Sequence, residues 1–150
     1  MAIRKIMTVG DDSLRKKAKP VEKIDDRIKM LLDDMSETMY ASDGIGLAAN
    51  QIGILKRIVV ADIGDGLIEL INPEIVSASG EAYESEGCLS VPNRRGIVKR
   101  PREMTVRAYN RDGEYLEYEA EGLLARVFSH EIDHLNGILF IDKAEKLVND

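Results

Sequence analysis

At 150 residues with 44% hydrophobic content, the chain suits one compact domain (residues 1–150), and its length does not require a second. Its net charge of −6 argues against a general phosphate-binding surface, so we expect no direct nucleic-acid binding. The first ten residues lack the apolar block of a secretion signal, and no apolar run is long enough to span a bilayer. These features predict a cytoplasmic protein with no membrane partner.

The first half of the chain favours helix and then strand. A short helical turn is expected near residues 11–17, ended by Pro20. A longer helix is predicted over residues 25–42, where Asp25 suits its start and Gly44 stops its pattern. The apolar residues that carry the helical period are Ile28, Leu31, Leu32, Met35 and Met39.

The middle of the chain favours antiparallel sheet. Strands are predicted over residues 57–63 and 67–71, joined as a hairpin by the turn Gly64-Asp65-Gly66. Further strands are predicted over 73–79, 97–100, 104–110 and 115–120, with a tight connection at 111–114. A basic cluster formed by Arg94, Arg95, Lys99, Arg100 and Arg102 is interpreted as a solvated strand edge rather than a nucleic-acid contact.

Helical spacing returns over residues 122–135. Leu123, Val127, His130 and His134 recur along one face, and Gly137 can stop the helix. The predicted fold is therefore α+β, with antiparallel sheets packed around this helix and a further helix near the N-terminus.

The last part of this helix, HEIDH over residues 130–134, contains both histidines of the chain. Residues four apart lie one turn above each other, so His130 and His134 can reach one cation. Glu131 points about 100° away and can contact a water bound to that cation. Asp133 and nearby backbone carbonyls are candidates to fix the imidazole tautomers.

A third ligand must come from elsewhere, because after Gly137 the chain has three acids and no histidine. The only cysteine, Cys88, is the strongest candidate, since a thiolate binds borderline or soft cations well. Taken alone, Cys88 would sooner be interpreted as a buried apolar residue. Two nitrogens and one sulfur would leave a fourth position for water, as in catalytic sites.

Three segments resemble the signatures of the peptide deformylases in order and spacing: GIGLAANQ (44–51), EGCLS (86–90) and HEIDHL (130–135). The resemblance implies a hydrolase that removes the N-formyl group from the N-terminal methionine of newly synthesised proteins. It implies one divalent metal ion per chain, usually Fe²⁺, with Zn²⁺, Ni²⁺ or Co²⁺ able to substitute. The implied partners are N-formylmethionyl nascent peptides.

The same resemblance implies a role for each site residue. Cys88, His130 and His134 would be the metal ligands. Glu131 would take a proton from the metal-bound water as that water attacks the formyl carbon, and would then deliver one to the departing amine. Gln51 and the backbone N–H of Leu89 would stabilise the oxyanion.

Flanking residues suit an extended peptide that carries a methionine. Small residues of the segment 44–49 let a peptide backbone approach, and Gly46 is the expected partner. Leu123 and Val127 precede His130 on its helical face, and Ile45 would close an apolar slot from the loop. The alternative is that these three side chains are ordinary core.

Three features depart from the family pattern. Ser129 stands where a glutamine is common, and Arg126 stands where many relatives have an apolar residue at the mouth of the methionine pocket. Few residues follow Gly137, so the long C-terminal helix that some relatives use to approach the ribosome is not expected. Transient proximity to the ribosome stays open.

Two rival functions remain at this level. One is a metallopeptidase that cleaves internal peptide bonds with the same metal helix. The other is a non-enzymatic protein with a structural zinc site, which would need a fourth protein ligand although the chain has no further histidine or cysteine.

Overall fold

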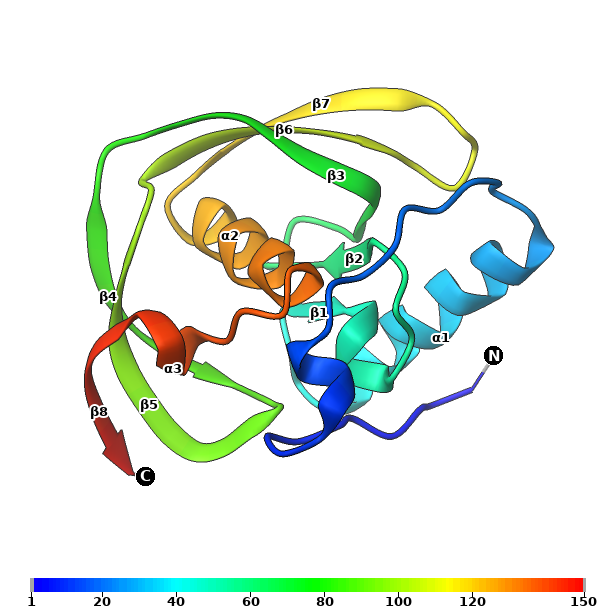
Figure 1. The fold of residues 1–150 in the computed structure, drawn as a ribbon. Coiled ribbons are helices and arrows are strands. Elements are labelled where there is room, and N and C mark those ends of the chain that lie inside the picture. Colours follow the sequence, from blue (N-terminus) through cyan, green and yellow to red (C-terminus); the bar gives the residue numbers. More distant parts are fainter. Residues whose placement is uncertain (1, 150) are drawn as a thin grey trace.

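The computed structural model describes residues 2–149 and has the α+β fold predicted from the sequence (Figure 1). Two antiparallel sheets and helical segments make up the described part of the chain. The helical elements are η1 (Asp12–Arg15), α1 (Asp26–Ala41), η2 (Ala49–Ile52), α2 (Leu123–Leu135) and α3 (Phe140–Lys143). The strands are β1 (Gly46–Ala48), β2 (Ile58–Ala61), β3 (Ile68–Ser79), β4 (Ala82–Cys88), β5 (Val91–Arg100), β6 (Glu103–Tyr109), β7 (Tyr115–Glu121) and β8 (Ala144–Asn149).

Helix α1 confirms the helix predicted over 25–42. The Asp25 side chain caps its start by accepting a hydrogen bond from the Ile28 amide at 3.2 Å. Past its last turn, the Gly44 amide donates to the Met39 carbonyl at 2.9 Å. The predicted apolar face is buried, so α1 is fixed to the molecule by its own periodicity. The short turn η1 also lies where a helical turn was expected.

The five-stranded sheet has the order β1-β2-β3-β6-β7, and all its pairs are antiparallel. Its β2–β3 pair confirms the hairpin around Gly64-Asp65-Gly66. The strands expected at 67–71 and 73–79 form one strand, β3, with an irregularity at Asn72. Asn72 adopts a φ of 54°, and its side-chain amide bonds the backbone of Val21, which holds the distortion in place.

The three-stranded sheet has the order β4-β5-β8. Strand β5 begins six residues before the predicted start at Ile97, and neither β4 nor β8 was predicted. Strand β4 is exposed or half-buried at all residues but Glu86 and is rich in polar side chains, so its sequence lacks the alternation that signals a strand. Strands β1 and β4 each pair with one neighbour only, which makes both of them sheet edges.

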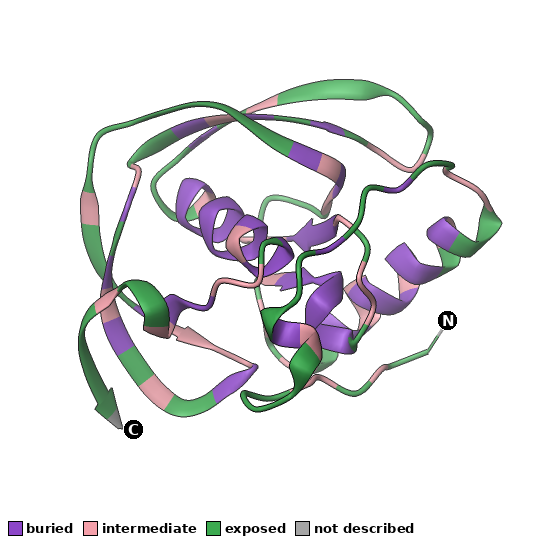
Figure 2. Cartoon of the chain, viewed as in Figure 1, coloured by how far each residue is buried: buried purple, intermediate pink, exposed green. Residues whose placement is uncertain are grey.

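Helix α2 contacts strands of both sheets: β1, β2 and β7 of the larger one and β5 of the smaller one (Figure 1). It confirms the helix predicted over 122–135, and it is mostly buried (Figure 2). Phe128 and Leu135 are fully buried in a core that α2 shares with the five-stranded sheet. Within residues 2–149, no helix is long and apolar enough to cross a membrane.

An extended N-terminal segment, residues 2–9, joins parts of the molecule that are distant in sequence. The Met7 amide donates to the Gln51 carbonyl at 2.6 Å, and the Val9 amide donates to the Ser90 carbonyl at 2.7 Å. Ser90 follows closely after Cys88, so this segment links two of the three signature segments through backbone bonds.

Candidate metal centre

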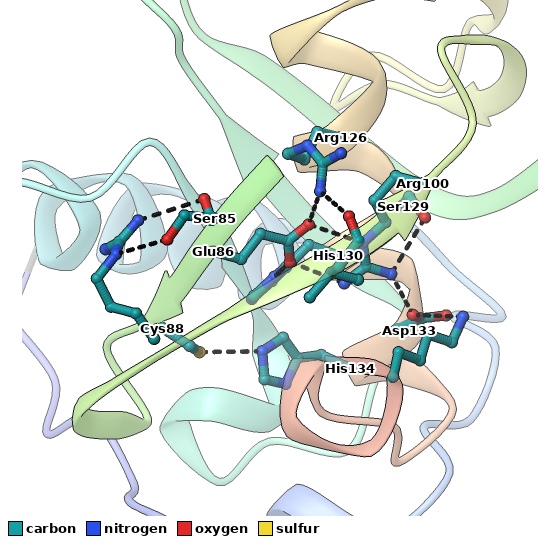
Figure 3. Close-up of polar contacts among 12 residues, drawn as sticks. Ser85, Glu86, Cys88, Arg100, Arg126, Ser129, His130, Asp133 and His134 are labelled. Carbon is teal, nitrogen blue, oxygen red and sulfur yellow. Dashed lines mark hydrogen bonds and ion pairs between the residues drawn. The ribbon is translucent and has the colours of Figure 1, made fainter. Parts of the chain in front are cut away.

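Cys88, His130 and His134 come together at the end of β4 and on α2 (Figure 3). One donor atom from each lies within 4.8 Å of the other two. Cys88 Sγ is 3.3 Å from His134 Nε2, and the two imidazole ring centroids are 5.1 Å apart. A thiolate and two imidazoles are a donor set that suits Fe²⁺, Zn²⁺, Ni²⁺ or Co²⁺. The three donor atoms are therefore close enough together to hold one metal ion.

Glu86 fixes the orientation of the His130 ring. Its Oε1 lies 2.8 Å from His130 Nδ1, which donates in this pair and leaves Nε2 on the other side of the ring. Asp133 and nearby backbone carbonyls were the candidates for this role, and for His130 the partner is Glu86 instead. The Asp133 carboxylate instead accepts from Arg100 at 2.6 Å and pairs with Lys143 at 2.9 Å. His134 Nδ1 is buried with no hydrogen-bond partner among the described residues.

The buried ion cluster consists of Glu86, Arg100, Arg126, His130 and Asp133. Arg100 makes two bonds of 2.9 Å to the Glu86 carboxylate, and Arg126 also donates to it. Burial alone would raise the pKa of Glu86, but hydrogen bonds from His130 and Arg100 bring it well below its usual range. The carboxylate is therefore ionised and held in one position.

Two arginines bear on expectations from the sequence, and the structure corrects the one for Arg100. Arg100 was assigned to a solvated strand edge, yet it is 2% exposed, because its guanidinium is satisfied by Glu86, Asp133 and Ser129. Arg126 was expected at the pocket mouth. It borders the cavity, but it is buried and also donates to the carbonyls of Val98 at 3.0 Å and Ala82 at 2.8 Å.

A cavity of about 610 Å³ opens beside the three donor atoms. The sequence-predicted residues that line it are Ile45, Gly46, Gln51, Cys88, Leu89, Leu123, Val127, His130 and Glu131. His134 is the one predicted site residue that does not line it, because it is fully buried. A space of this size can hold a short peptide end next to the donor atoms.

Glu131 is buried in this site with an unpaired acceptor. Its Oε1 has no hydrogen-bond partner among the described residues, and burial raises its pKa to about 7. A Cβ atom on residue 46 would lie 2.8 Å from Glu131 Oε2 and 2.8 Å from Val127 Cγ1. Only glycine at position 46 leaves the carboxylate this room, so β1 and α2 approach each other closely at the site.

The Gln51 side chain is held on the other side of Cys88. Its Oε1 accepts from the Ala48 amide at 3.0 Å, which places the amide nitrogen toward Ser90 and Cys88. Nε2 lies 3.1 Å from Ser90 Oγ and 3.6 Å from Cys88 Sγ. The side-chain N–H group of Gln51 therefore has a fixed orientation and lies next to the sulfur of Cys88.

The apolar residues of the cavity divide between two environments. Leu123 is 52% exposed and Ile45 is 43% exposed, so neither is ordinary core. Val127 is buried and also lines the cavity. Side chains that are apolar and exposed at a cavity suit an apolar ligand group.

Sequence reasoning gave Glu86 and Ser90 no role in this site, although both belong to the EGCLS segment. Glu86 had one available signal, since it directly precedes Gly87 and Cys88. Ser90 had no signal beyond its place in that segment, because hydroxyl residues are exposed in most sequence contexts.

Comparisons with known proteins agree with these motifs. The family model described as polypeptide deformylase matches residues 3–150. Peptide deformylases of Thermoanaerobacter pseudethanolicus and Caldicellulosiruptor bescii are 57% and 59% identical over 150 residues, covering 100% of this chain and 94% and 90% of theirs. The crystal structure of peptide deformylase from Thermotoga maritima superposes with a TM-score of 0.95 at 46% identity, covering 97% of this chain and 100% of that one. The chain therefore belongs to the peptide deformylase family of enzymes.

Proposed function

We propose that the chain removes the N-formyl group from the N-terminal methionine of newly synthesised proteins, as a hydrolase that uses one divalent metal ion. The observation that carries this proposal is the meeting of Cys88, His130 and His134 donor atoms within 4.8 Å, beside a cavity lined by Glu131. Membership of the family supports the proposed substrate class.

Cys88, His130 and His134 would hold the metal, with Fe²⁺ as the first choice and Zn²⁺, Ni²⁺ or Co²⁺ as substitutes. When bound, the metal would act as a Lewis acid and lower the pKa of water. The protein's contribution is to keep the three donors together, and Glu86 does this for His130 through the bond to Nδ1.

Glu131 is proposed as the general base and then the general acid. Its unpaired Oε1 can accept a proton from the attacking water, and the same carboxyl can then protonate the amine that leaves. A buried carboxyl with a pKa of about 7 is suited to exchange protons in both directions near neutral pH.

Gln51 and Leu89 are proposed to stabilise the negative oxygen that develops on the formyl carbon. Gln51 Nε2 is already oriented by the bond between its Oε1 and the Ala48 amide. The Leu89 backbone N–H follows directly after Cys88 at the wall of the cavity. Loss of one such donor typically raises the barrier by about 2.7–4 kcal/mol.

The substrate is proposed to lie as an extended strand along the free edge of β1. Gly46 would contact its backbone, as expected from the sequence, since no side chain intervenes at this position. Leu123, Val127 and Ile45 would surround the methionine side chain. The half-exposed Leu123 and Ile45 would lose contact with water when the slot fills.

The test is deformylation of a formyl-Met-Ala-Ser peptide by protein prepared without oxygen, with metal content measured on the same sample. Turnover is expected with the formylated peptide. Glu131→Gln should lose at least about 100-fold in kcat while it keeps its metal. Cleavage of unformylated peptides at internal bonds, with no deformylation, would favour the rival metallopeptidase. Near-native kcat in Glu131→Gln would overturn the role of Glu131.

A second test uses actinonin, which is bound in a crystal structure of a peptide deformylase from Synechococcus elongatus. That protein is 43% identical to this chain, with a TM-score of 0.91 over 94% of this chain and 78% of that one. Actinonin should compete with the formylated peptide for the cavity. Inhibition that is not competitive would contradict the shared site.

A further inference from the structure

Two arginines of β5, Arg94 and Arg95, lie at the wall of the cavity with no known task in the proposed reaction. Asp43, in the loop between α1 and β1, also lines the cavity. The other carboxylates of the lining, Glu86 and Glu131, are buried within the site itself. The accessible charged groups of the cavity wall are thus Arg94, Arg95 and Asp43, which together favour positive charge. The chain as a whole carries a net charge of −6.

Arg95 is held in place without being neutralised. Its Nε donates to Ser85 Oγ at 3.1 Å and its Nη2 donates to the Ser85 carbonyl at 3.3 Å, which links β5 to β4. A Cβ atom on residue 87 would lie 2.7 Å from Arg95 Nη1, so this nitrogen lies over the backbone directly before Cys88. Both anchors are neutral oxygens, and the guanidinium keeps its full charge.

Neighbouring cations on the same strand are paired with acids. Lys99 is 3.2 Å from Glu81, and Arg100 is bonded to Glu86 and Asp133. Among residues 2–149, no carboxylate lies within 4.0 Å of the cationic nitrogens of Arg94 or Arg95. Among the described residues, the cations of β5 that lack an acidic partner are thus confined to the part of the strand that borders the cavity.

The position of the proposed reaction site determines which part of the substrate lies near Arg94 and Arg95. The reacting formyl group would lie at Cys88 and Glu131, with the methionine side chain against α2. The residues after the methionine must then leave the cavity between the free edges of β1 and β4. Gly87 of β4 is the point where Arg95 approaches that path.

We propose that Arg94 and Arg95 are specificity determinants that favour formyl-methionyl peptides with an acidic side chain at the second or third residue. This inference rests on the proposed function. A carboxylate there would gain a charge-assisted hydrogen bond from a guanidinium that is already oriented. A lysine at the same place would meet uncompensated positive charge.

The experiment compares kcat/KM for formyl-Met-Ala-Xaa-amide and formyl-Met-Xaa-Ala-amide peptides, with Xaa as Glu, Ala or Lys. The amide removes the terminal carboxylate as a competing anion. We expect kcat/KM for the Glu peptide to exceed that for the Lys peptide about three- to tenfold in at least one of the two positions. The difference should lie mainly in KM, as for partly exposed charge pairs. The ratio should shrink toward one at about 1 M salt, where the screening length is about 3 Å.

The double charge reversal Arg94→Glu/Arg95→Glu should invert this preference, so that kcat/KM for the Lys peptide exceeds that for the Glu peptide. Lys99→Glu is the matched control, because it changes charge on the same strand at an exposed residue that does not line the cavity. It should keep the wild-type order. If the double reversal does not fold or lacks metal, Arg94→Gln/Arg95→Gln replaces it and should bring the ratio close to one.

Equal kcat/KM for the Glu and Lys peptides at both positions in the wild-type protein would overturn the proposal. A wild-type order kept in either double variant would overturn it as well. Deformylation of none of the formylated peptides by metal-loaded wild-type protein is a different result, since it would contradict the proposed function itself.

Discussion

The two sides of helix α2 are held by opposite kinds of contact. Toward the five-stranded sheet, Phe128, Ile132 and Leu135 pack into an apolar core. Toward the three-stranded sheet, Arg126 and His130 join the buried ion cluster through Glu86. Apolar contacts have no direction and tolerate small changes in shape, whereas each buried ion depends on a particular partner. The apolar side of the helix thus fixes its place and tolerates small changes, whereas the ionic side depends on particular partners and orients His130, a proposed metal ligand.

The largest effect should come from removing the central anion of the cluster. Glu86→Ala leaves Arg126 without its buried acid and deprives Arg100 of one of two, so we expect a loss of roughly 3–5 kcal/mol in unfolding free energy. Urea denaturation measures this loss. Metal affinity should also fall about 10–100-fold, because His130 loses its orienting partner.

Glu81→Ala is the control for that variant. Glu81 is exposed and pairs with Lys99, so its removal should cost less than about 1 kcal/mol. Equal losses in Glu86→Ala and Glu81→Ala would show that the buried ions need no mutual compensation, and the contrast between the two sides of α2 would fail.

The second-largest effect should come from metal binding, which is expected to stabilise one side of α2 more than the other. Saturating Fe²⁺ or Zn²⁺ at about 100 times the dissociation constant should stabilise the fold by about 2.7 kcal/mol, and chelation should reverse this gain. Hydrogen exchange should show the added protection in β4 and α2, which carry the donors, rather than in β6 and β7. Metal should no longer stabilise the fold of the Cys88→Ala variant. Uniform protection across both sheets would contradict the assignment of the metal to one side.

Removing a buried methylene group from the apolar core should lower the unfolding free energy by less. Ile71→Val removes one buried methylene group from β3 and should cost about 0.5–1.5 kcal/mol without changing metal content. Val76→Ala, at an exposed position on the same strand, should change stability by no more than about 0.5 kcal/mol. Ile71 lies in the core that α1 shares with the five-stranded sheet, so loss of metal in Ile71→Val would mean that this core also orients the proposed ligands.

The smallest effect concerns the N-terminal segment. Burial would raise the pKa of Asp34, but hydrogen bonds from the Arg4 side chain and the Ala2 amide lower it instead. Because the folded pKa lies below the unfolded value, this contribution is present above the unfolded pKa and is lost as pH falls through the folded one. Arg4 is more than a third exposed, so the loss should stay under about 1 kcal/mol.

An NMR titration of the Asp34 carboxyl checks that expectation, with stability measured from pH 7 to pH 2. Asp34→Asn is the control, and it should lack this acid-dependent component. A folded-state midpoint above that of a model peptide would give the dependence the opposite sign.

The same contrast explains which parts could be predicted from the sequence. Apolar periodicity predicted α1, α2 and the β2–β3 hairpin, because their burial leaves a pattern in consecutive residues. Strand β4 could not be predicted, since an exposed edge strand needs no apolar alternation. Its place follows from pairing with β5, a contact between segments.

The site shows the same division. The four-residue spacing of His130 and His134 is local, so helix geometry alone predicts that they lie together. Cys88 could be proposed because no histidine remained. The burial of Arg100 and the partners of Glu86 depend on three segments that meet only in the folded chain. A charged residue gives no sign in the sequence that it will be buried with a counterion.

The bonds of the N-terminal segment have a consequence for how the molecule assembles. Hairpins such as β6–β7 join residues close in sequence and can form within microseconds. The Val9 bond to Ser90 and the approach of Cys88 to His134 each require closure of a long loop, which is slower. We expect the sheets to acquire protection first and the residues around Cys88 last. Pulse-labelled hydrogen exchange during refolding, followed at the Val9 amide, would reveal whether the region around the candidate metal centre is the final part of the protein to become ordered.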